Sequence, residues 1–335
     1  MFQVILTWNL SKPDQQLGNV IANIKIRGYQ RKKIILPTEY KNKIMDGGIK
    51  SLSVSNIVDK ICPTRRDLYY RKGVRPPGNV PRTNSWGSKA GTIVEKYLEA
   101  ITKDLDITPQ NYSTISQISE DLHDDFKRLK RKNIRELTQL EKPGEEGTTD
   151  WLQSLLNCNM RAELAAKILH SLLNERDVID FSHIQIKRKL HPNDKEIGIS
   201  DKVEPDYILP DFGIVGDIKT GIRFEPYHQL TCAGYALAYE SERKKNKKNR
   251  NINWGIVYFI QTRIPKEYAK SLTFPQIYIF PIDDTLRGAF LTIRNEAYAL
   301  ISRNECPIFP NTQEKEKCQF CRYFDYCRSL GLVWP

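Results

Sequence analysis

The chain has 335 residues, enough to bury one large core or a core with a helical appendage. Its formal net charge of +12 and its pI near 9.2 suit a polyanionic partner such as nucleic acid. No apolar run is long enough to cross a membrane, and the first ten residues lack the pattern of a secretory signal. We therefore expect a cytoplasmic protein whose seven cysteines serve metal binding or packing rather than disulfides.

The first half of the chain is predicted to be mainly helical. Residues 1–48 mix short apolar runs with basic residues and carry no readable function, and a helix is expected to begin near Ser51. Residues 86–101 have helical periodicity with one apolar stripe, and Glu95 lies at the edge of that stripe. An ordinary amphipathic-helix glutamate and a functional residue explain Glu95 equally well. Further helices are predicted over 116–141 and 151–174.

The second half alternates strands with helices, and this order predicts an α/β domain with a mixed sheet. A basic run over 243–250 indicates either a solvated loop or, together with Arg65 and Arg66, a surface that contacts phosphates. The segment 306–327 is predicted to be an irregular tail containing cysteines. Strands are expected over 184–190, 203–209, 214–218, 254–260 and 276–282, and helices over 227–240 and 285–302.

The two central strands are predicted to form a hairpin. Residues 210–213 have turn chemistry, because proline presets one backbone dihedral and Gly213 permits a positive one. A four-residue loop places Leu209 opposite Ile214, and counting outward places Asp206 opposite Asp217.

The hairpin register brings charged side chains to one face of the sheet. Side-chain alternation puts Glu204, Asp206, Asp217 and Lys219 together. Two opposed carboxylates repel each other, so a divalent cation is expected between them, with Lys219 close enough to hold a water. Removing one carboxylate is then expected to relieve repulsion in the metal-free protein. The alternative is a solvated face with an ion pair between Glu204 and Lys219.

Several motifs now agree in order with a known family. Pro205-Asp206 followed by Asp217-Ile218-Lys219 resembles the PD-(D/E)xK nuclease signature. Together with other segments it resembles the RecB-like CRISPR-associated exonucleases of the Cas-four family, in particular the archaeal type I-A branch. The resemblance covers roughly residues 51–327 without the long helical stretch. The other segments are Ser53–Ser55, Cys62–Tyr69, Gly91–Glu95, Gly234–Ala238, Leu286–Ala297 and Cys318-x2-Cys321-x5-Cys327.

The resemblance implies a fold and a division of the chain. The expected fold is α/β, with a restriction-endonuclease-like PD-(D/E)xK core whose mixed sheet is flanked by helices. A helical insertion and a cysteine-ligated cluster region would be added to it. The expected parts are an N-terminal segment (1–50), the first cluster cysteine with the first active-site helix (51–102), the helical insertion (103–180), the nuclease core (181–303) and the C-terminal cysteine region (304–335).

The resemblance also implies an activity. The family cuts DNA with Mn²⁺ or Mg²⁺ and trims single-stranded or overhanging DNA ends for CRISPR spacer acquisition, alongside the integrase complex and other adaptation proteins. The rival interpretations are a non-catalytic DNA-end-binding subunit and a RecB-type repair nuclease. Carried over by position, the metal residues are Glu95, Asp206, Asp217 and Ile218, and the catalytic residues also include Lys219, Gln229 and Tyr235.

Two positions depart from the family pattern. Glu95 stands where histidine is frequent, although glutamate is an acceptable ligand for Mg²⁺ or Mn²⁺. The family's glutamine lies four residues before the helical tyrosine. Here Thr231 lies four before Tyr235, and Gln229 lies six before it.

The resemblance implies a 4Fe–4S cluster held by Cys318, Cys321 and Cys327. Zinc is the local alternative, because thiolates suit zinc too. The fourth ligand comes from elsewhere in the chain: family position favours Cys62, and Cys306 is the rival. Cys232 is expected to be a core residue because it lies on the apolar side of its helix.

Overall fold

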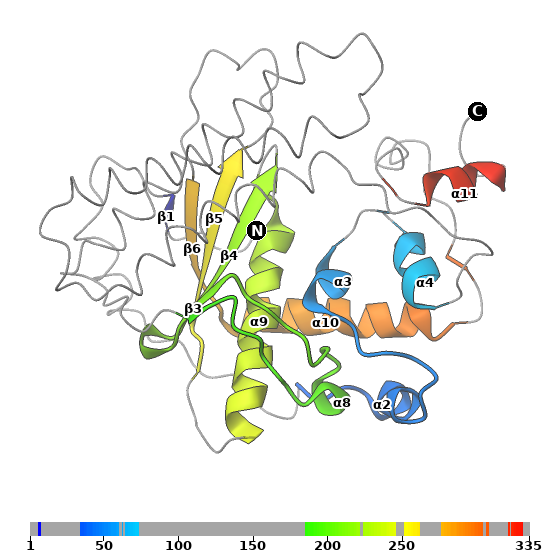
Figure 1. The fold of residues 1–335 in the computed structure, drawn as a ribbon, viewed down its shortest axis with the longest axis horizontal. Coiled ribbons are helices and arrows are strands. Elements are labelled where there is room, and N and C mark those ends of the chain that lie inside the picture. Colours follow the sequence, from blue (N-terminus) through cyan, green and yellow to red (C-terminus); the bar gives the residue numbers. More distant parts are fainter. Residues whose placement is uncertain are drawn as a thin grey trace, which may run out of the picture.

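The computed structural model describes residues 6–7, 34–59, 62, 64–73, 185–221, 224–245, 251–261, 276–303, 306–307, 321 and 323–330. Within this part, six strands form one sheet in the order β1-β6-β5-β4-β3-β2 (Figure 1). Strands β4 and β5 pair in parallel and the other neighbours are antiparallel. The strands are β1 (Leu6–Thr7), β2 (Gln185–Ile186), β3 (Tyr207–Leu209), β4 (Ile214–Gly221), β5 (Trp254–Gln261) and β6 (Gln276–Pro281).

Helices flank this sheet, so the predicted α/β architecture with a mixed sheet is confirmed (Figure 1). The predicted helices over 86–101, 116–141 and 151–174 lie outside the described residues. None of the described helices is long and apolar enough to cross a bilayer. The described α-helices are α2 (Thr38–Met45), α3 (Val54–Val58), α4 (Arg66–Lys72), α8 (Asp194–Ile197), α9 (Pro226–Lys245), α10 (Asp284–Ile301) and α11 (Phe324–Ser329).

The central hairpin has the predicted register. Leu209 pairs with Ile214, and the turn between β3 and β4 is a short 3₁₀ helix over Pro210–Phe212. Gly213 follows with φ of 63°, and a Cβ there would lie 2.9 Å from the carbonyl oxygen of Asn251. Glycine is therefore required both by the backbone conformation and by the close approach of the next loop.

The hairpin strands differ in length from the prediction. β3 begins only at Tyr207, and Val203 forms an isolated bridge with Leu190 instead of extending the strand. β4 continues to Gly221 because its full length pairs with β5. A parallel pair needs a crossover connection, and α9 supplies it and packs on the sheet.

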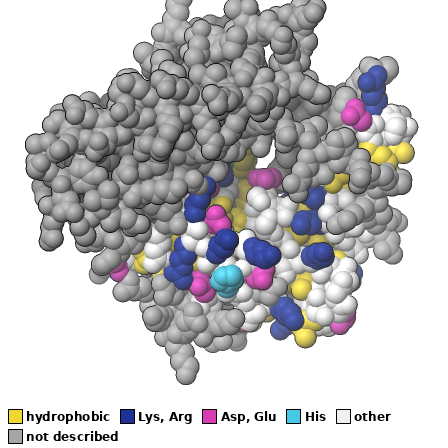
Figure 2. Space-filling view, viewed as in Figure 1, with side chains coloured by type: hydrophobic (Ala, Val, Ile, Leu, Met, Phe, Trp, Pro, Cys, Tyr) yellow, Lys and Arg dark blue, Asp and Glu magenta, His cyan; other side chains and the backbone are white. Residues whose placement is uncertain are grey.

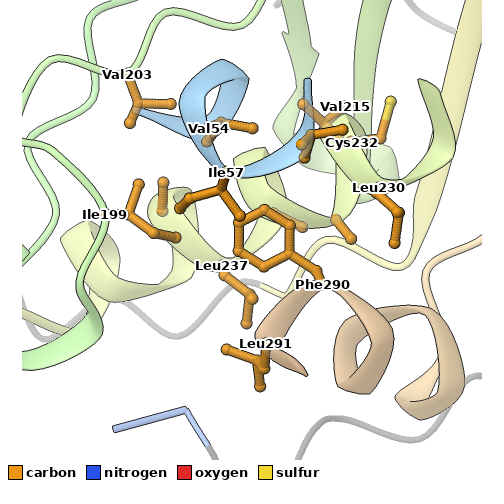
Figure 3. Close-up of a cluster of buried hydrophobic side chains, with 14 of the residues drawn as sticks. Val54, Ile57, Ile199, Val203, Val215, Leu230, Cys232, Leu237, Phe290 and Leu291 are labelled. Atoms are coloured by element: carbon orange, nitrogen blue, oxygen red, sulfur yellow. The ribbon is translucent and has the colours of Figure 1, made fainter. Parts of the chain in front are cut away.

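Phe290 of α10 lies at the centre of the core, between α3 and α9 (Figure 3). A Cβ added to Gly234 of α9 would lie 2.6 Å from the Phe290 ring and 2.8 Å from Val54 of α3. The missing side chain thus lets three helices meet closely. Cys232 on α9 is fully buried in this core, as predicted.

Two fully buried arginines brace α10. The guanidinium of Arg287 donates to both carboxylate oxygens of Glu240 on α9, at 2.8 and 2.7 Å, and to the carbonyl of Ile252 at 2.6 Å. Arg294 donates to the carbonyls of Ile34 and Ile197, each at 2.6 Å. These bonds tie α9, the end of α8 and the segments that precede α2 and β5 to α10.

The helix expected to begin near Ser51 is confirmed as α3, whose N-cap is Ser53, and the short helix α4 follows Cys62. Two predicted boundaries are wrong. The tail is not irregular throughout, since Cys327 lies on α11. α9 extends to Lys245, into the start of the basic run that was predicted as a loop.

Candidate active site and cysteine cluster

Asp206 is fixed at the entrance to β3 by the backbone of β4. Its Oδ2 accepts the N–H of Ile218 at 2.6 Å, and its carbonyl accepts the N–H of Lys187 at 3.0 Å. Tyr207 pairs with Gly216, so Asp206 and Asp217 are the next residues along the two strands. The structure thus brings these two acids together in the predicted register.

Lys219 provides a positive charge beside the two acids. Its Nζ lies 2.8 Å from Oδ2 of Asp217, whose side chain is almost fully buried. Burial alone would lower the pKa of Lys219, but the carboxylate of Asp217, followed by those of Asp206 and Asp59, outweighs it and raises the pKa. Glu204 is exposed, so the predicted alternative of a Glu204–Lys219 ion pair is wrong in this structure.

The first turns of α9 cover this group of charges. Burial raises the pKa of Tyr235, and the negative charges of Asp217 and Asp206 raise it further. Thr231 donates its hydroxyl to the carbonyl of Tyr227 at 3.3 Å, so that group is committed to the helix backbone. Gln229 is 2% exposed, and its Nε2 has no hydrogen-bond partner in the described part of the chain.

His228 belongs to the site although the sequence did not single it out. Its ring stacks on Phe259 with centroids 5.9 Å apart, and Phe259 is the β5 partner of Lys219 in the parallel register. Nδ1 accepts the N–H of Glu225 at 3.1 Å. Burial, followed by the charge of Lys219, lowers the pKa of His228 to about 3, so the imidazole is neutral. Its position next to Gln229 is the only signal that the sequence offered.

Asp59 is a third acid near Lys219, and it too was missed. It is the C-cap residue of α3, and its N–H donates to the carbonyl of Ser55 at 2.8 Å. Burial raises the pKa of Asp59, while Lys219 and then Arg71 act in the opposite direction. Asp59 lies three residues before Cys62, between two of the segments that carry the family resemblance. Glu95, the other predicted acid, lies outside the described residues.

Three of the predicted cluster cysteines lie near one another. Burial raises the pKa of the Cys321 thiol to about 12, and the charges of Asp67, Cys62 and Cys327 add to this. Cys62 and Cys327 are both buried. Cys318 lies outside the described residues, and the described ones contain no group of three or more ligands arranged to hold a metal ion.

Tyrosine rings enclose the cysteine region. Tyr69, Tyr70 and Tyr323 pack with Cys327, and Tyr70 lies edge-on to Tyr326 with centroids 5.3 Å apart. These rings join α4 to the segment that contains α11, so residues far apart in the sequence form one small core.

Cys306 lies at the edge of this core and is exposed. Its Sγ donates to the hydroxyl of Tyr70 at 3.3 Å. Arg66 donates to the same hydroxyl at 2.5 Å and to the carbonyl of Pro307 at 2.8 Å. The thiol is therefore part of a hydrogen-bonded network outside the group formed by Cys62, Cys321 and Cys327.

The prediction that Arg65 and Arg66 contact phosphates is wrong. Both are buried, with 7% and 8% of their surface exposed. Arg65 donates to the carbonyls of Asn56 and Ile57 at 2.8 and 2.6 Å, so it closes the end of α3 instead of facing solvent. On the face in Figure 2, Lys and Arg side chains are interspersed with Asp and Glu.

Comparison with known proteins relates these observations to a family. A family model described as "CRISPR-associated exonuclease Csa1" matches residues 43–329, from α2 to the end of α11. A curated protein of that name from Saccharolobus solfataricus is 25% identical over 288 residues, which are 83% of this chain and 86% of that protein. No solved structure matches the chain.

Proposed function

The chain belongs to the CRISPR-associated exonuclease Csa1 family, and from this premise we propose that it is a Mn²⁺- or Mg²⁺-dependent DNA exonuclease with a PD-(D/E)xK core. The observation that carries the proposal is the group formed by Asp206, Asp217 and Lys219 on the central hairpin. Two acids and a lysine at this position have the chemistry that phosphodiester hydrolysis requires.

The residues present fit a hard divalent cation. Asp206 and Asp217 offer carboxylate oxygens, which Mg²⁺ and Mn²⁺ prefer. The N–H of Ile218 fixes one oxygen of Asp206 and thereby orients the other. We propose that Asp206, Asp217, Glu95 and Ile218 hold the metal. When bound, the metal would polarise the scissile phosphate and neutralise the charge that develops on it.

The remaining groups position water and DNA. Lys219 carries a proton at neutral pH, because Asp217 raises its pKa, so its ammonium orients the attacking water by donating to it. Gln229 has a buried amide N–H₂ with no partner among the described residues, and this supports a role inside the site rather than on its surface. Tyr235 lies near both acids and closes the site from the α9 side.

We propose that the cysteine region holds a 4Fe–4S cluster with a structural role, with Cys318, Cys321 and Cys327 as local ligands and Cys62 as the fourth. In support, Cys62 and Cys327 both lie near Cys321, and Cys327 packs in a tyrosine-lined core. The cluster would join the loop between α3 and α4 to α11. Cys62 is buried and acts on Cys321, whereas Cys306 is exposed, and this favours Cys62 over Cys306 as a ligand.

We propose that the nuclease trims single-stranded or overhanging DNA ends for CRISPR spacer acquisition, in contact with the integrase complex and other adaptation proteins. The family name, CRISPR-associated exonuclease, supports this role. The net charge of +12 also suits a DNA substrate.

Cleavage of single-stranded DNA by purified variants tests the proposal. Asp217→Asn removes a metal ligand and Lys219→Ala removes the group that orients water, so each is expected to lower the rate by about 10²-fold or more. Both should remain folded by circular dichroism. Because Asp217 pairs with Lys219, its loss should lower the melting temperature of the metal-free protein and not raise it, contrary to the expectation from repulsion alone.

Glu204→Gln is the matched control, because Glu204 lies close to the hairpin but is exposed, and it should cut at the wild-type rate. Wild-type activity in the Asp217→Asn protein would show that the active site is assigned wrongly. A wild-type protein that binds DNA ends but does not cut them with either metal would instead indicate a non-catalytic end-binding subunit.

A further inference from the structure

Aromatic side chains adjoin Lys219 on the face of the sheet that α9 covers. Lys219 pairs with Phe259 in the parallel register, and each lies two residues before the end of its strand, near the arrowheads of β4 and β5 (Figure 1). Val257 shares a face of β5 with Phe259, and it pairs with Tyr278 of β6. Lys219, Phe259 and Tyr278 therefore lie on one face of three neighbouring strands.

Three further rings continue this group at the start of α9. The ring of Phe224 stacks on that of Tyr278, with centroids 3.8 Å apart and an angle of 17° between the planes. The ring of His228 lies 5.2 Å from Phe224 and 5.9 Å from Phe259. Tyr227 meets His228 edge-on at 4.4 Å. We call this continuous group the aromatic platform; its members are Phe224, Tyr227, His228, Phe259 and Tyr278.

Tyr227 is the exposed end of the aromatic platform. Its side chain has 39% of its surface exposed, whereas His228 and Phe259 are 3% and 2% exposed. Burial of its inner part raises the pKa of the Tyr227 hydroxyl, so the hydroxyl keeps its proton at neutral pH. The imidazole of His228 is neutral as well. The platform therefore offers an uncharged aromatic surface to the solvent beside the active site.

The start of α9 holds Tyr227 in one place. Pro226 is the first helical residue, where the fixed φ of proline suits the start of a helix. The N–H of Glu225 donates to Nδ1 of His228 at 3.1 Å, and the N–H of His228 donates back to the carbonyl of Glu225 at 3.0 Å. Thr231 bonds the carbonyl of Tyr227. Because the backbone of Tyr227 is already ordered, little conformational entropy is lost when a flat group stacks on its ring.

The surroundings of the platform indicate what stacks on it. The proposed function places the scissile phosphate at Asp206, Asp217 and Lys219, and each phosphate of a DNA strand is joined through its sugar to a base. An uncharged platform does not attract a phosphate, but every base has a π-face that stacks on an aromatic ring, whatever the sequence. The bases of a duplex are already stacked and paired, so an unpaired base fits this surface best.

We propose that Tyr227 is a base-stacking residue, and that its ring binds an unpaired base of the DNA strand beside the phosphate that is cleaved. The inference rests on the proposed nuclease function and deepens it. It gives the site a physical reason to prefer single-stranded ends, because the last base of a paired end would have to leave its partner before it could reach Tyr227.

The experiment measures binding without cleavage. Fluorescence anisotropy gives the Kd of the metal-free protein for a single-stranded oligonucleotide, at one salt concentration because salt changes the affinity for DNA. Tyr227→Ala is expected to raise this Kd at least about fivefold, through the loss of one stacked base. Tyr227→Phe keeps the ring and should bind within about twofold of wild type. The Kd for a blunt duplex should change less than about twofold in Tyr227→Ala.

A set of oligonucleotides that each lack one base separates stacking from a structural role. The effect of Tyr227→Ala should disappear when the missing base is the one that stacks, because both changes remove the same contact. At the other positions the two effects should add. A structural role of Tyr227 would instead weaken the binding of every oligonucleotide by the same factor.

Tyr40→Ala is the matched control. Tyr40 is a partly exposed tyrosine on α2, which packs on α8, and its ring stacks on Tyr298 with centroids 5.9 Å apart. Its removal should leave the Kd for DNA unchanged.

The outcomes separate this inference from the proposed function. A Kd within twofold of wild type for Tyr227→Ala, or additive effects at every position of the missing base, would overturn the stacking role alone if the wild type still cuts DNA. A wild type that shows the coupling between Tyr227 and one base but cuts DNA with neither metal would support the stacking role and overturn the proposed nuclease.

Discussion

At the scale of single residues, His228 shows how the surroundings of an active site fix a protonation state. The ring is 3% exposed, lies among Phe224, Tyr227 and Phe259, and accepts a backbone N–H at Nδ1. A neutral imidazole that accepts at Nδ1 carries its proton on Nε2. It therefore adds no second positive charge beside Lys219. Such a charge would weaken the attraction of the site for a metal.

This protonation state predicts a dependence of stability on pH. The pKa of His228 is lowered to about 3 in the folded protein, while the unfolded chain has the ordinary value near 6.5. Between these two values the unfolded state binds the proton and the folded state does not, so stability is lost as pH falls through this window. The contribution of His228 has a slope of about 1.4 kcal/mol per pH unit.

Urea unfolding of the metal-free protein at several pH values from 7 to 4 measures this slope. Carboxylates also titrate in the lower part of the range, so the informative quantity is the difference between wild type and His228→Phe. The slope of stability against pH should lack the contribution of one imidazole in His228→Phe. The slope for His191→Phe, at an exposed position, should equal that of wild type. Parallel curves for His228→Phe and wild type would contradict the buried neutral state.

At the scale of elements, the sequence predicts what is decided locally. The hairpin register follows from Pro210, Gly213 and the alternation on both strands, and a register error of one residue would have separated Asp206 from Asp217. The strands β5 and β6 and the helices α9 and α10 also follow from periodicity, with ends that differ by a few residues. Asp206 and Asp217 could therefore be placed together before the structure was known.

The residues that were missed depend on contacts between distant elements. Asp59 belongs to α3, which lies near the site because it packs on α9, and His228 meets Phe259 only because α9 crosses from β4 to β5. Neither contact has a signal within a short window of sequence. Arg65 and Arg66 were assigned to the surface for the same reason, since a basic pair is usually solvated unless distant carbonyls are available to it.

The brace between α9 and α10 predicts a large loss of stability. Arg287→Met leaves the Glu240 carboxylate and the carbonyl of Ile252 without their buried donor, at a cost of about 3–5 kcal/mol. Urea unfolding at neutral pH measures this change. Arg303→Met, at an exposed position just after the same helix, is the control and should change stability by less than about 0.5 kcal/mol. A similar small change for Arg287→Met would mean that the ion pair contributes little.

At the scale of the whole molecule, the cysteine region joins two parts of the chain that are far apart in the sequence, α4 and α11. Cys62 precedes α4 and Cys327 lies on α11, and the tyrosine core holds the two helices together. Because metal binding to the folded state adds to the free energy of unfolding, the proposed cluster would lock this junction.

We predict that the protein purified without oxygen is brown and contains about four irons and no stoichiometric zinc. Cys62→Ala should bleach it and expose the loop between α3 and α4 to proteolysis. Cys306→Ala is the matched control, because Cys306 is exposed whereas Cys62 is buried, and it should remain brown. Absorption spectra and metal analysis provide the measurement.

Two outcomes would correct this assignment in different ways. A colourless anaerobic preparation with one tightly bound zinc would replace the iron–sulfur cluster by a structural zinc site. A bleached Cys306 variant beside a brown Cys62 variant would keep the cluster and change its fourth ligand.

The hydrogen bonds of α10 have a consequence for how the chain is made. The N–H of Leu52 donates to the hydroxyl of Tyr298, 246 residues later, and Arg294 donates to the carbonyl of Ile34, 260 residues earlier. Segments that are far apart in the sequence thus supply each other's hydrogen-bond partners. A ribosome adds about 5–20 residues per second, so the N-terminal helices leave it on the order of tens of seconds before α10. Part of α3 can meet α9 before that, but its contacts with α10 have to wait. The native hydrogen bonds of Leu52 and Ile34 therefore form only when the synthesis of the chain is almost finished.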